Sequence, residues 1–334
     1  MLIISDTKLI KTPTAIALGN FDGIHRGHQI VLQPIANGLG DLPEDIIVLR
    51  QSTIVYPSVV SFSPHPREFF TGQKLQLLTP VTEKAEFLAQ IGIEQLILLP
   101  FDQRLASLTP QEFVADIIVK QLQAKYISVG EDFRFGNQRK GTALDLKQMA
   151  ANWGVKVHLN TLHKCRHFDS LKCDREVPPL CRGRKEVRIS SSLIRQALLD
   201  GQVERANFML GRPYQLIGKV VAGQQLGRTI GFPTANLQLP ADKFLPRYGV
   251  YAVEVLFDCS TIKGVMNIGC RPTVAGEAPT VEVHLLNWSG DLYGQTLKVS
   301  LKRFLRTEQK FPSLDALKQQ ITIDCQAALA GHRV

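Results

Sequence analysis

Hydrophobic and polar positions follow two different patterns along this chain. Up to residue 198, short apolar runs alternate with segments of helical periodicity, the order that a parallel sheet with crossover helices requires. The segment Thr109-Pro110-Gln111-Glu112 has the N-cap, the N1 proline and the capping-box glutamate of a helix start. The first part is therefore predicted to be an α/β domain. Its expected strands are Thr14–Leu18, Val59–Phe62, Gln95–Leu99, Tyr126–Val129 and Val155–Leu159.

From residue 211 onward, strand-like runs follow one another with only turn residues between them. These runs are LIGKVVAG, GVYAVEVLF, IKGVMNIG, TVEVHLLNW and TLKVSLKRFL. Because no helix separates them, they predict an antiparallel sheet or a small barrel. A terminal helix is expected after Ser313, with Leu314, Leu317, Ile321 and Cys325 at helical spacing. Residues 199–210 are expected to link the two domains as a helix and a turn.

Composition fits two well-cored domains. The chain has 334 residues, of which 44% are hydrophobic, and none of its apolar runs approaches the ~18 residues of a membrane span. The N-terminus lacks the pattern of a signal peptide. We therefore expect a cytoplasmic protein without a membrane partner, whose six cysteines are thiols. The net charge of +9 favours acidic partners, which could be nucleotides, nucleic acid or membrane lipid.

The stretch GNFDGIHRGH, residues 19–28, follows the first expected strand and runs into an expected helix over 24–32. Its glycines allow a sharp turn and close approach to a ligand, and a helix N-terminus attracts phosphate. His25 and His28 are three residues apart, so one helical face would carry both imidazoles toward a phosphate. A zinc pair on a helix is usually spaced i, i+4 with a glutamate between, which is absent here. The motif therefore predicts a phosphate site.

Two further strand ends carry polar turns. Val59–Phe62 runs into Ser63-Pro64-His65-Pro66, and Tyr126–Val129 runs into GEDFRFGNQRKG with Asp132. Ligands of an open parallel sheet bind beyond the carboxyl ends of its strands, so His65 and Asp132 are candidates for the same cleft. The alternative is a turn residue for His65 and a helix cap for Asp132.

The segment RISSSLIR, residues 188–195, places three serines before a helical pattern. The simplest interpretation is a set of N-caps. The functional interpretation is a second phosphate cradle, in which Ser191 and Ser192 orient a triphosphate. Arg188 and Arg195 would then supply positive charge to the leaving pyrophosphate.

In this order, GNFDGIHRGH, SFSPHP, VGEDFRFG and ISSSLIR resemble the nucleotidyltransferase half of the prokaryotic bifunctional riboflavin kinase/FAD synthetase family. GFPTAN and the segments around it resemble the riboflavin kinase barrel of that family. The resemblance implies a Rossmann-like FMN adenylyltransferase domain at 1–198, a linker at 199–210 and a riboflavin kinase domain at 211–334. The implied reactions convert riboflavin and ATP to FMN, and then FMN and ATP to FAD and pyrophosphate.

In the implied adenylyltransferase site, His25 and His28 steady the α-phosphate while Arg188, Ser191, Ser192 and Arg195 hold the triphosphate. Residues implied to contact ATP there are Gly19, Asn20, Phe21, Asp22, Gly23, His65 and Asp132. In the implied kinase site, Glu282 is the general base toward the ribityl 5′-hydroxyl, while Thr234 and Asn236 hold Mg²⁺ and the ATP phosphates. The glycine flap and turn at that site comprise Gly223, Gly227, Arg228 and Gly231, and the implied flavin contacts are Phe232, Asn267, Arg271 and Glu282.

The sequence departs from the family pattern in three places. Leu226 stands where an arginine is frequent in the flap, and Asn287-Trp288 replaces an Asp-Phe pair. Ser192 replaces threonine but keeps the hydroxyl.

The segment from His163 to Arg188 is unusually basic, with eight Lys/Arg against four Asp/Glu. Its histidines and cysteines match no CxxC zinc spacing, so a solvated loop is the preferred interpretation.

Two alternatives remain open from the sequence. One is an adenylyltransferase for another phosphomonoester fused to a flavin-binding barrel, which GFPTAN and Glu282 disfavour. The other is a basic nucleic-acid-binding or regulatory protein on a degenerate enzyme scaffold, which would bind nucleic acid in a strongly salt-dependent way without turnover. We expect only small-molecule partners (ATP, riboflavin and FMN), no nucleic acid, and a monomer or transient homo-oligomer.

Overall fold

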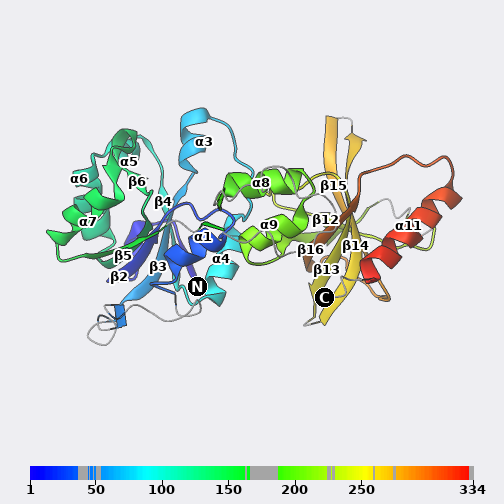
Figure 1. Ribbon diagram of the computed structural model, residues 1–334, viewed down its shortest axis with the longest axis horizontal. Coiled ribbons are helices and arrows are strands. Elements are labelled where there is room, and N and C mark those ends of the chain that lie inside the picture. Colours follow the sequence, from blue (N-terminus) through cyan, green and yellow to red (C-terminus); the bar gives the residue numbers. More distant parts are fainter. Residues whose placement is uncertain are drawn as a thin grey trace. The chain divides into compact units, whose positions relative to one another are not determined.

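The computed structural model describes residues 1–36, 44, 46, 47, 49, 54–161, 164–165, 187–223, 227, 230–258, 260–273 and 276–330. Within these, the chain forms two compact units, residues 1–190 and 191–334 (Figure 1). The boundary lies before the helix that starts at Ser191, rather than after it at residue 198. Residues 203–210 of the expected linker form a helix of the second unit. None of the helices in the described ranges is long and apolar enough to cross a membrane.

The first unit is built on a six-stranded sheet in the order β1-β4-β3-β2-β5-β8, and every neighbouring pair is parallel. All five predicted strands are confirmed, and β1 is a sixth that the sequence pattern did not reveal. Short two-stranded sheets join β6 to β7 and β9 to β10. The strands are β1 (Leu2–Ile4), β2 (Thr14–Leu18), β3 (Tyr56–Ser63), β4 (Gln95–Pro100), β5 (Ala124–Gly130), β6 (Arg134–Phe135), β7 (Gly141–Thr142), β8 (Lys156–Asn160), β9 (Lys164–Cys165) and β10 (Val187–Arg188).

Helices cover both faces of this sheet. The predicted capping box at Thr109 and Glu112 is confirmed, and the helix body after it is a π-helix in which the Leu122 N–H donates to the Ile117 carbonyl. The helical elements are η1 (Thr7–Leu9), α1 (Arg26–Leu32), α3 (Pro66–Thr71), α4 (Val81–Gln90), α5 (Gln103–Ser107), α6 (Pro110–Glu112), η2 (Phe113–Gln121), η3 (Asn137–Arg139) and α7 (Ala143–Ala151).

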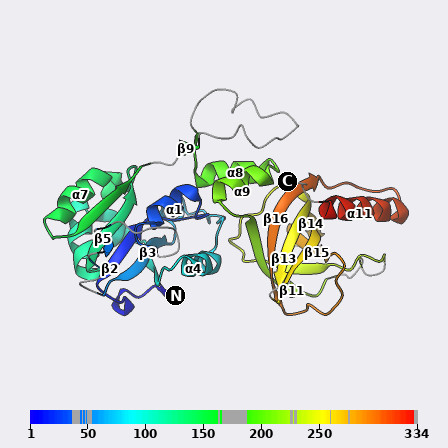
Figure 2. The same cartoon turned by 60° about the horizontal axis from the view of Figure 1, so that its bottom comes forward.

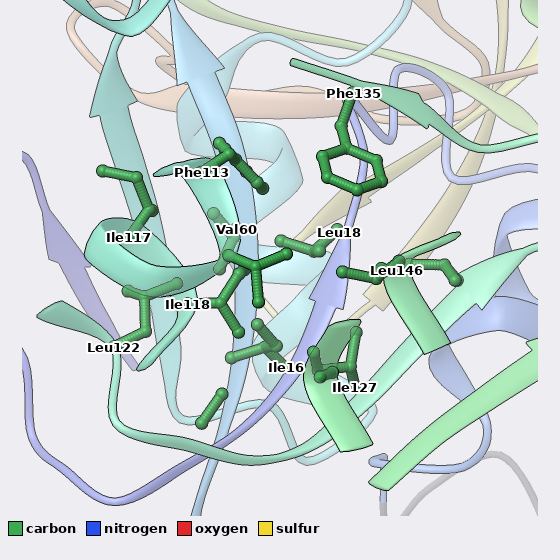
Figure 3. Close-up of a cluster of buried hydrophobic side chains, with 14 of the residues drawn as sticks. Ile16, Leu18, Val60, Phe113, Ile117, Ile118, Leu122, Ile127, Phe135 and Leu146 are labelled. Carbon is green, nitrogen blue, oxygen red and sulfur yellow. The ribbon is translucent and has the colours of Figure 1, made fainter. Parts of the chain in front are cut away.

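Alternation along the strands divides the core of this unit into two layers. On one face, Ile16, Val60 and Ile127 pack against η2 and α7, as Figure 3 shows. On the other face, Ala15, Ala17 and Val59 pack against side chains of α1 and α4. Figure 2 shows these two helices beside the sheet. Because these strands are buried on both faces, they appear in the sequence as continuous apolar runs.

The second unit is a closed antiparallel barrel in the order β11-β12-β15-β14-β13-β16, which confirms the predicted barrel. The predicted terminal helix and its Ser313 N-cap are also confirmed, and this helix packs against β13 and β14. The elements are α8 (Ser191–Leu199), α9 (Val203–Leu210), β11 (Tyr214–Val221), β12 (Ala235–Gln238), β13 (Gly249–Phe257), β14 (Ser260–Thr273), β15 (Gly276–Leu285), β16 (Thr296–Arg306) and α11 (Leu314–Leu329).

Candidate active sites

The loop from Gly19 to His25 leaves the carboxyl end of β2 and reverses direction within a few residues. Phe21 and Ile24 adopt positive φ angles of 48° and 40°, which side-chain-bearing residues rarely do. The Asn20 carbonyl points into the protein, where the Lys84 ammonium from α4 donates to it at 2.7 Å. The Asn20 Oδ1 atom is buried and accepts no hydrogen bond within the described ranges. A buried acceptor of this kind suits a ligand donor or an ordered water.

Asp22 and Gly23 are tied to the segment that precedes α4. The Thr79 N–H donates to Asp22 Oδ1 at 3.1 Å, and the Gly23 N–H donates to Thr79 Oγ1 at 2.9 Å. Gly19 is also engaged, since its N–H donates to the Val60 carbonyl at 3.1 Å. These contacts show how the three residues shape the loop, and their predicted contacts with ATP stay predictions.

His25 and His28 lie together, but not as two residues on one helical face. The predicted helix start at Ile24 is two residues early, because Ile24 has a positive φ and His25 is the N-cap of α1. The two imidazoles stack with centroids 3.6 Å apart and planes 14° apart. Gly27 allows this arrangement, since a Cβ there would lie 3.2 Å from the His25 ring.

The hydrogen bond at this cap defines the tautomer of His25. The His28 backbone N–H donates to His25 Nδ1 at 3.2 Å, so Nδ1 carries no proton and a neutral His25 is protonated at Nε2. His25 is 5% exposed, and the edge of Phe21 packs against His28 at 5.3 Å between ring centroids. The pair therefore presents a positioned N–H donor beside the loop that follows β2.

His65 and Asp132 both lie just beyond strand ends, as predicted. His65 is the N-cap of α3: its Nδ1 accepts from the Arg67 N–H, and its own N–H donates to Glu68. Asp132 follows β5 and forms an ion pair with Arg188. That ion pair connects Arg188, the first residue of the segment RISSSLIR, to the carboxyl edge of the sheet.

The serine motif lies at the start of a helix, and an N-cap role for its serines stays a prediction. Ser191 is the first residue of α8 and Ser192 the second, both in the second unit. The Arg195 guanidinium lies 5.7 Å from the centroid of the Phe244 ring in the same unit. The role of these three residues in binding a triphosphate stays a prediction.

A pocket of about 300 Å³ opens between the second half of α1 and the end of β8. Asn160 anchors one wall, because its amide donates to Ser128 Oγ and to the Val129 carbonyl. No pocket residue was a predicted site residue, although Asn160 directly follows the fifth predicted strand, Val155–Leu159, and ends the observed β8. The lining residues are Ile30, Gln33, Pro34, His158, Leu159, Asn160 and Thr161.

In the barrel, three predicted site residues are direct neighbours on adjacent strands. Glu282 of β15 is paired with Asn236 of β12 on one side and with Asn267 of β14 on the other. Cross-strand partners point to the same face of a sheet, so the three side chains share one surface. Thr234 Oγ1 lies 3.4 Å from Glu282 Oε2 and extends this row of oxygen-bearing groups.

The GFPTAN turn is held against the same strand. Gly231 has a φ of +90°, which favours glycine at this bend. His284 Nδ1 lies 2.7 Å from the Pro233 carbonyl, and the Phe232 ring meets the His284 ring edge-on. His284 was not a predicted site residue, although it shares the outward face of β15 with Glu282.

The described part of the glycine-rich segment lies close to Thr234 and Asn236. A Cβ at Gly223 would come within 2.9 Å of Asn236 Oδ1, and one at Gly227 within 3.4 Å of Thr234 Oγ1. Leu226 and Arg228 lie outside the described residues. Arg271 pairs with Ala278 as part of β14, and its side chain is outside the described part of the chain.

The histidines and cysteines weighed for zinc (His163, Cys165, His167, Cys173 and Cys181) also lie outside the described residues, apart from the Cys165 backbone in β9. Within the described ranges, no group of three or more His, Cys, Asp or Glu residues is placed to hold a metal ion.

Both halves of the chain match known families. A family model described as FAD synthetase matches residues 7–168, and one described as Riboflavin kinase matches residues 210–331. A curated Bifunctional riboflavin kinase/FMN adenylyltransferase from Escherichia coli (strain K12) is 41% identical over 311 residues, covering 92% of this chain and 90% of the relative.

The chain belongs to the bifunctional riboflavin kinase/FMN adenylyltransferase family. The Bacillus subtilis (strain 168) member is 34% identical over 95% of this chain and 92% of its own length. A solved structure named Macrolide-efflux Protein from Streptococcus pneumoniae is 32% identical, with a TM-score of 0.79 and 98% of each chain covered. The protein phosphorylates riboflavin with ATP to give FMN, and it adenylylates FMN with ATP to give FAD and pyrophosphate.

Proposed function

We propose that the two reactions are divided between the two units: residues 1–190 form FAD and the barrel forms FMN. The matches of FAD synthetase to residues 7–168 and of Riboflavin kinase to residues 210–331 support this division. The structural observation that carries it is the row of Asn236, Glu282 and Asn267 in the barrel, with Thr234 beside it.

In the barrel, Glu282 is the general base that takes the proton from the ribityl 5′-hydroxyl of riboflavin as that oxygen attacks the γ-phosphorus of ATP. The bond from the γ-phosphorus to the β,γ-bridging oxygen breaks, and ADP leaves. It is the carboxylate beside Thr234, and its neighbours on both strands are amides rather than other charges. Phe232, Asn267 and Arg271 contact the flavin. The segment from Gly223 to Gly231 covers the nucleotide, and the proximity of Gly223 to Asn236 and of Gly227 to Thr234 supports this role.

The donors at this site fit Mg²⁺. A hydroxyl, an amide oxygen and one carboxylate are hard oxygen ligands, and Mg²⁺ commonly binds few protein groups while keeping waters and substrate phosphates. Thr234 and Asn236 would hold the ion, which supplies charge neutralisation on the transferring phosphate. The Thr234 hydroxyl lies 3.4 Å from Glu282 Oε2, so the carboxylate is close to the hydroxyl that would bind the ion.

In the first unit, the stacked histidines face the α-phosphate of ATP. His25 Nε2–H donates to an oxygen on which negative charge builds as the FMN phosphate attacks, and His28 adds a second donor. The attacking FMN phosphate is already ionised, so this step requires no general base. Asn20 orients the triphosphate together with Arg188, Ser191, Ser192 and Arg195, while the loop glycines, Phe21, Asp22, His65 and Asp132 shape the site.

The pocket between α1 and β8 extends this proposal to the nucleotide base. Its volume of about 300 Å³ and its mixed lining of aliphatic and amide side chains suit a flat heteroaromatic ring. The partners of the protein are then ATP, riboflavin and FMN, and we expect it to act in the cytoplasm as a monomer or a transient homo-oligomer. The net charge of +9 supports attraction of these anions.

The division of labour and the metal requirement are tested with the two half-reactions run separately. Riboflavin with ATP should give FMN, and FMN with ATP should give FAD, and both should stop when a chelator removes Mg²⁺. Mn²⁺ substituted for Mg²⁺ should give an electron paramagnetic resonance spectrum of bound ion, weakened by Thr234→Val with Asn236→Leu. Unchanged Mn²⁺ binding in that double variant would contradict the assigned ligands.

A further inference from the structure

A buried lysine lies directly beneath the loop that follows β2. Lys84, on helix α4, is 5% exposed, and burial lowers the pKa of its ammonium while the charge of Asp22 partly opposes that shift. Its Nζ donates to the Asn20 carbonyl at 2.7 Å. Burying an ammonium group is unfavourable, whereas a methionine of similar volume could be buried without that desolvation penalty. What the lysine adds over methionine is a hydrogen-bond donor aimed at that carbonyl.

The Asn20 carbonyl is held from two separate elements. Besides Lys84 of α4, the Ser61 hydroxyl of β3 lies 3.4 Å from the same oxygen. In a trans peptide the C=O and the following N–H point in opposite directions. Because the carbonyl points inward to Lys84, the Phe21 N–H points outward, and it donates to none of the described residues.

We propose that Lys84 is a positioning residue for FAD formation: by holding the Asn20 carbonyl, it orients the Asn20–Phe21 peptide so that the Phe21 N–H faces the phosphates of ATP. This inference rests on the proposed assignment of FAD formation to the first unit. The positive φ of Phe21 supports it, since a backbone held in this sparsely populated region needs surrounding contacts to maintain it. Lys84 itself does not touch the substrate.

The test replaces Lys84 with methionine, which keeps the volume and removes the donor. With saturating FMN, we expect the kcat for FAD formation to fall by about 10- to 100-fold, the loss that an ångström of misplacement produces. The KM for ATP should change only a few-fold. Lys120→Met is the matched control, because Lys120 is an exposed lysine of the same unit, ion-paired with Asp116. FMN formation by the barrel should stay at the wild-type level in both variants.

A purely structural role for Lys84 makes a different prediction. It would lower the melting temperature while leaving kcat near wild type at temperatures where the protein is folded. Lys84→Met leaves the charge of Asp22 buried, so the single variant is also combined with Asp22→Asn, which relieves that charge and keeps the acceptor for the Thr79 N–H. We expect the double variant to recover stability, yet to remain at least tenfold below Asp22→Asn alone in kcat.

A kcat within twofold of wild type for folded Lys84→Met would overturn the inference. So would a double variant as active as Asp22→Asn. A parallel assay of His28→Ala separates this result from failure of the proposed function. If His28→Ala abolishes FAD formation and Lys84→Met does not, only the role of Lys84 is wrong. If neither variant affects FAD formation, the assignment of that reaction to the first unit is wrong as well.

Discussion

The barrel and the parallel-sheet unit position their polar groups in different ways. In the barrel, Asn236, Glu282 and Asn267 lie on three neighbouring strands, and the strand register alone brings them together. In the first unit, the important groups lie on a loop whose backbone is held by side chains from far along the chain, Lys84 and Thr79. A site on strands tolerates changes around it better than a site on a loop, because fewer separate contacts define its geometry.

The largest effect should come from the barrel base. Glu282→Ala should lower FMN formation by about 10²- to 10⁴-fold, the usual contribution of a positioned general base, while FAD formation from supplied FMN continues. Flavins separated after incubation with ATP and Mg²⁺ give both rates. Glu254→Ala is the matched control, since Glu254 is a barrel carboxylate that pairs with Lys302. Equal loss of both activities in Glu282→Ala would contradict the division between units.

The next largest effect should come from the stacked histidines. His28→Ala should lower FAD formation by about 10²- to 10³-fold, because a donor to the developing charge is lost. FMN should accumulate, since the barrel is untouched. If FAD formation survived at the wild-type rate, the histidine pair would have no part in adenylyl transfer.

A smaller effect on the rate of FMN formation is expected when His284, which supports the GFPTAN turn of the barrel site, is replaced. His284→Ala removes the contact with the Pro233 carbonyl, and one hydrogen bond contributes about 1 kcal/mol, or roughly a fivefold change in rate. We expect the loss in FMN formation alone, measured at several Mg²⁺ concentrations. A hundredfold loss would show that the strand-borne site depends on its supporting contacts as strongly as the loop-borne one does.

Much of this organisation was predictable from the sequence, because strand ends and glycine turns leave local patterns. Five of the six strands of the sheet, the capping box at Thr109 and the cap at Ser313 follow from periodicity and capping alone. Lys84 was not predictable in this way. It occurs in the helix segment VTEKAEFLAQ, where a lysine is ordinarily solvated, and only the fold shows that its side chain turns inward to Asn20.

The helix start at Arg26, with His25 as its N-cap, was also missed, for a related reason. Sequence spacing placed His25 and His28 on one face of a helix, but the cap hydrogen bond to His25 Nδ1 and the space above Gly27 stack them instead. Side chains that cap a helix follow the geometry of its first turn, which periodicity does not encode. His284 was overlooked because its partner is a backbone carbonyl, which has no sequence signature.

The smallest expected effect is a pH dependence of stability. The ordinary pKa of a lysine is 10.5, and burial lowers the pKa of Lys84 below this value in the folded state. At a pH between the folded-state pKa and 10.5, the unfolded chain therefore binds a proton that the folded chain does not. The free energy of unfolding therefore rises with pH across that window, and the penalty for burying the charge is greatest at lower pH. Denaturant unfolding of wild type and Lys84→Met should show a difference that changes in this direction. Parallel pH profiles for the two proteins would contradict the burial of a titrating Lys84.

Each unit is expected to bind its own ATP. Isothermal titration of the whole protein with Mg²⁺ and a non-hydrolysable ATP analogue measures this directly. Two nucleotides per chain are predicted, with one lost when Thr234→Val and Asn236→Leu are combined. A stoichiometry of one nucleotide per chain in the wild-type protein would contradict the account.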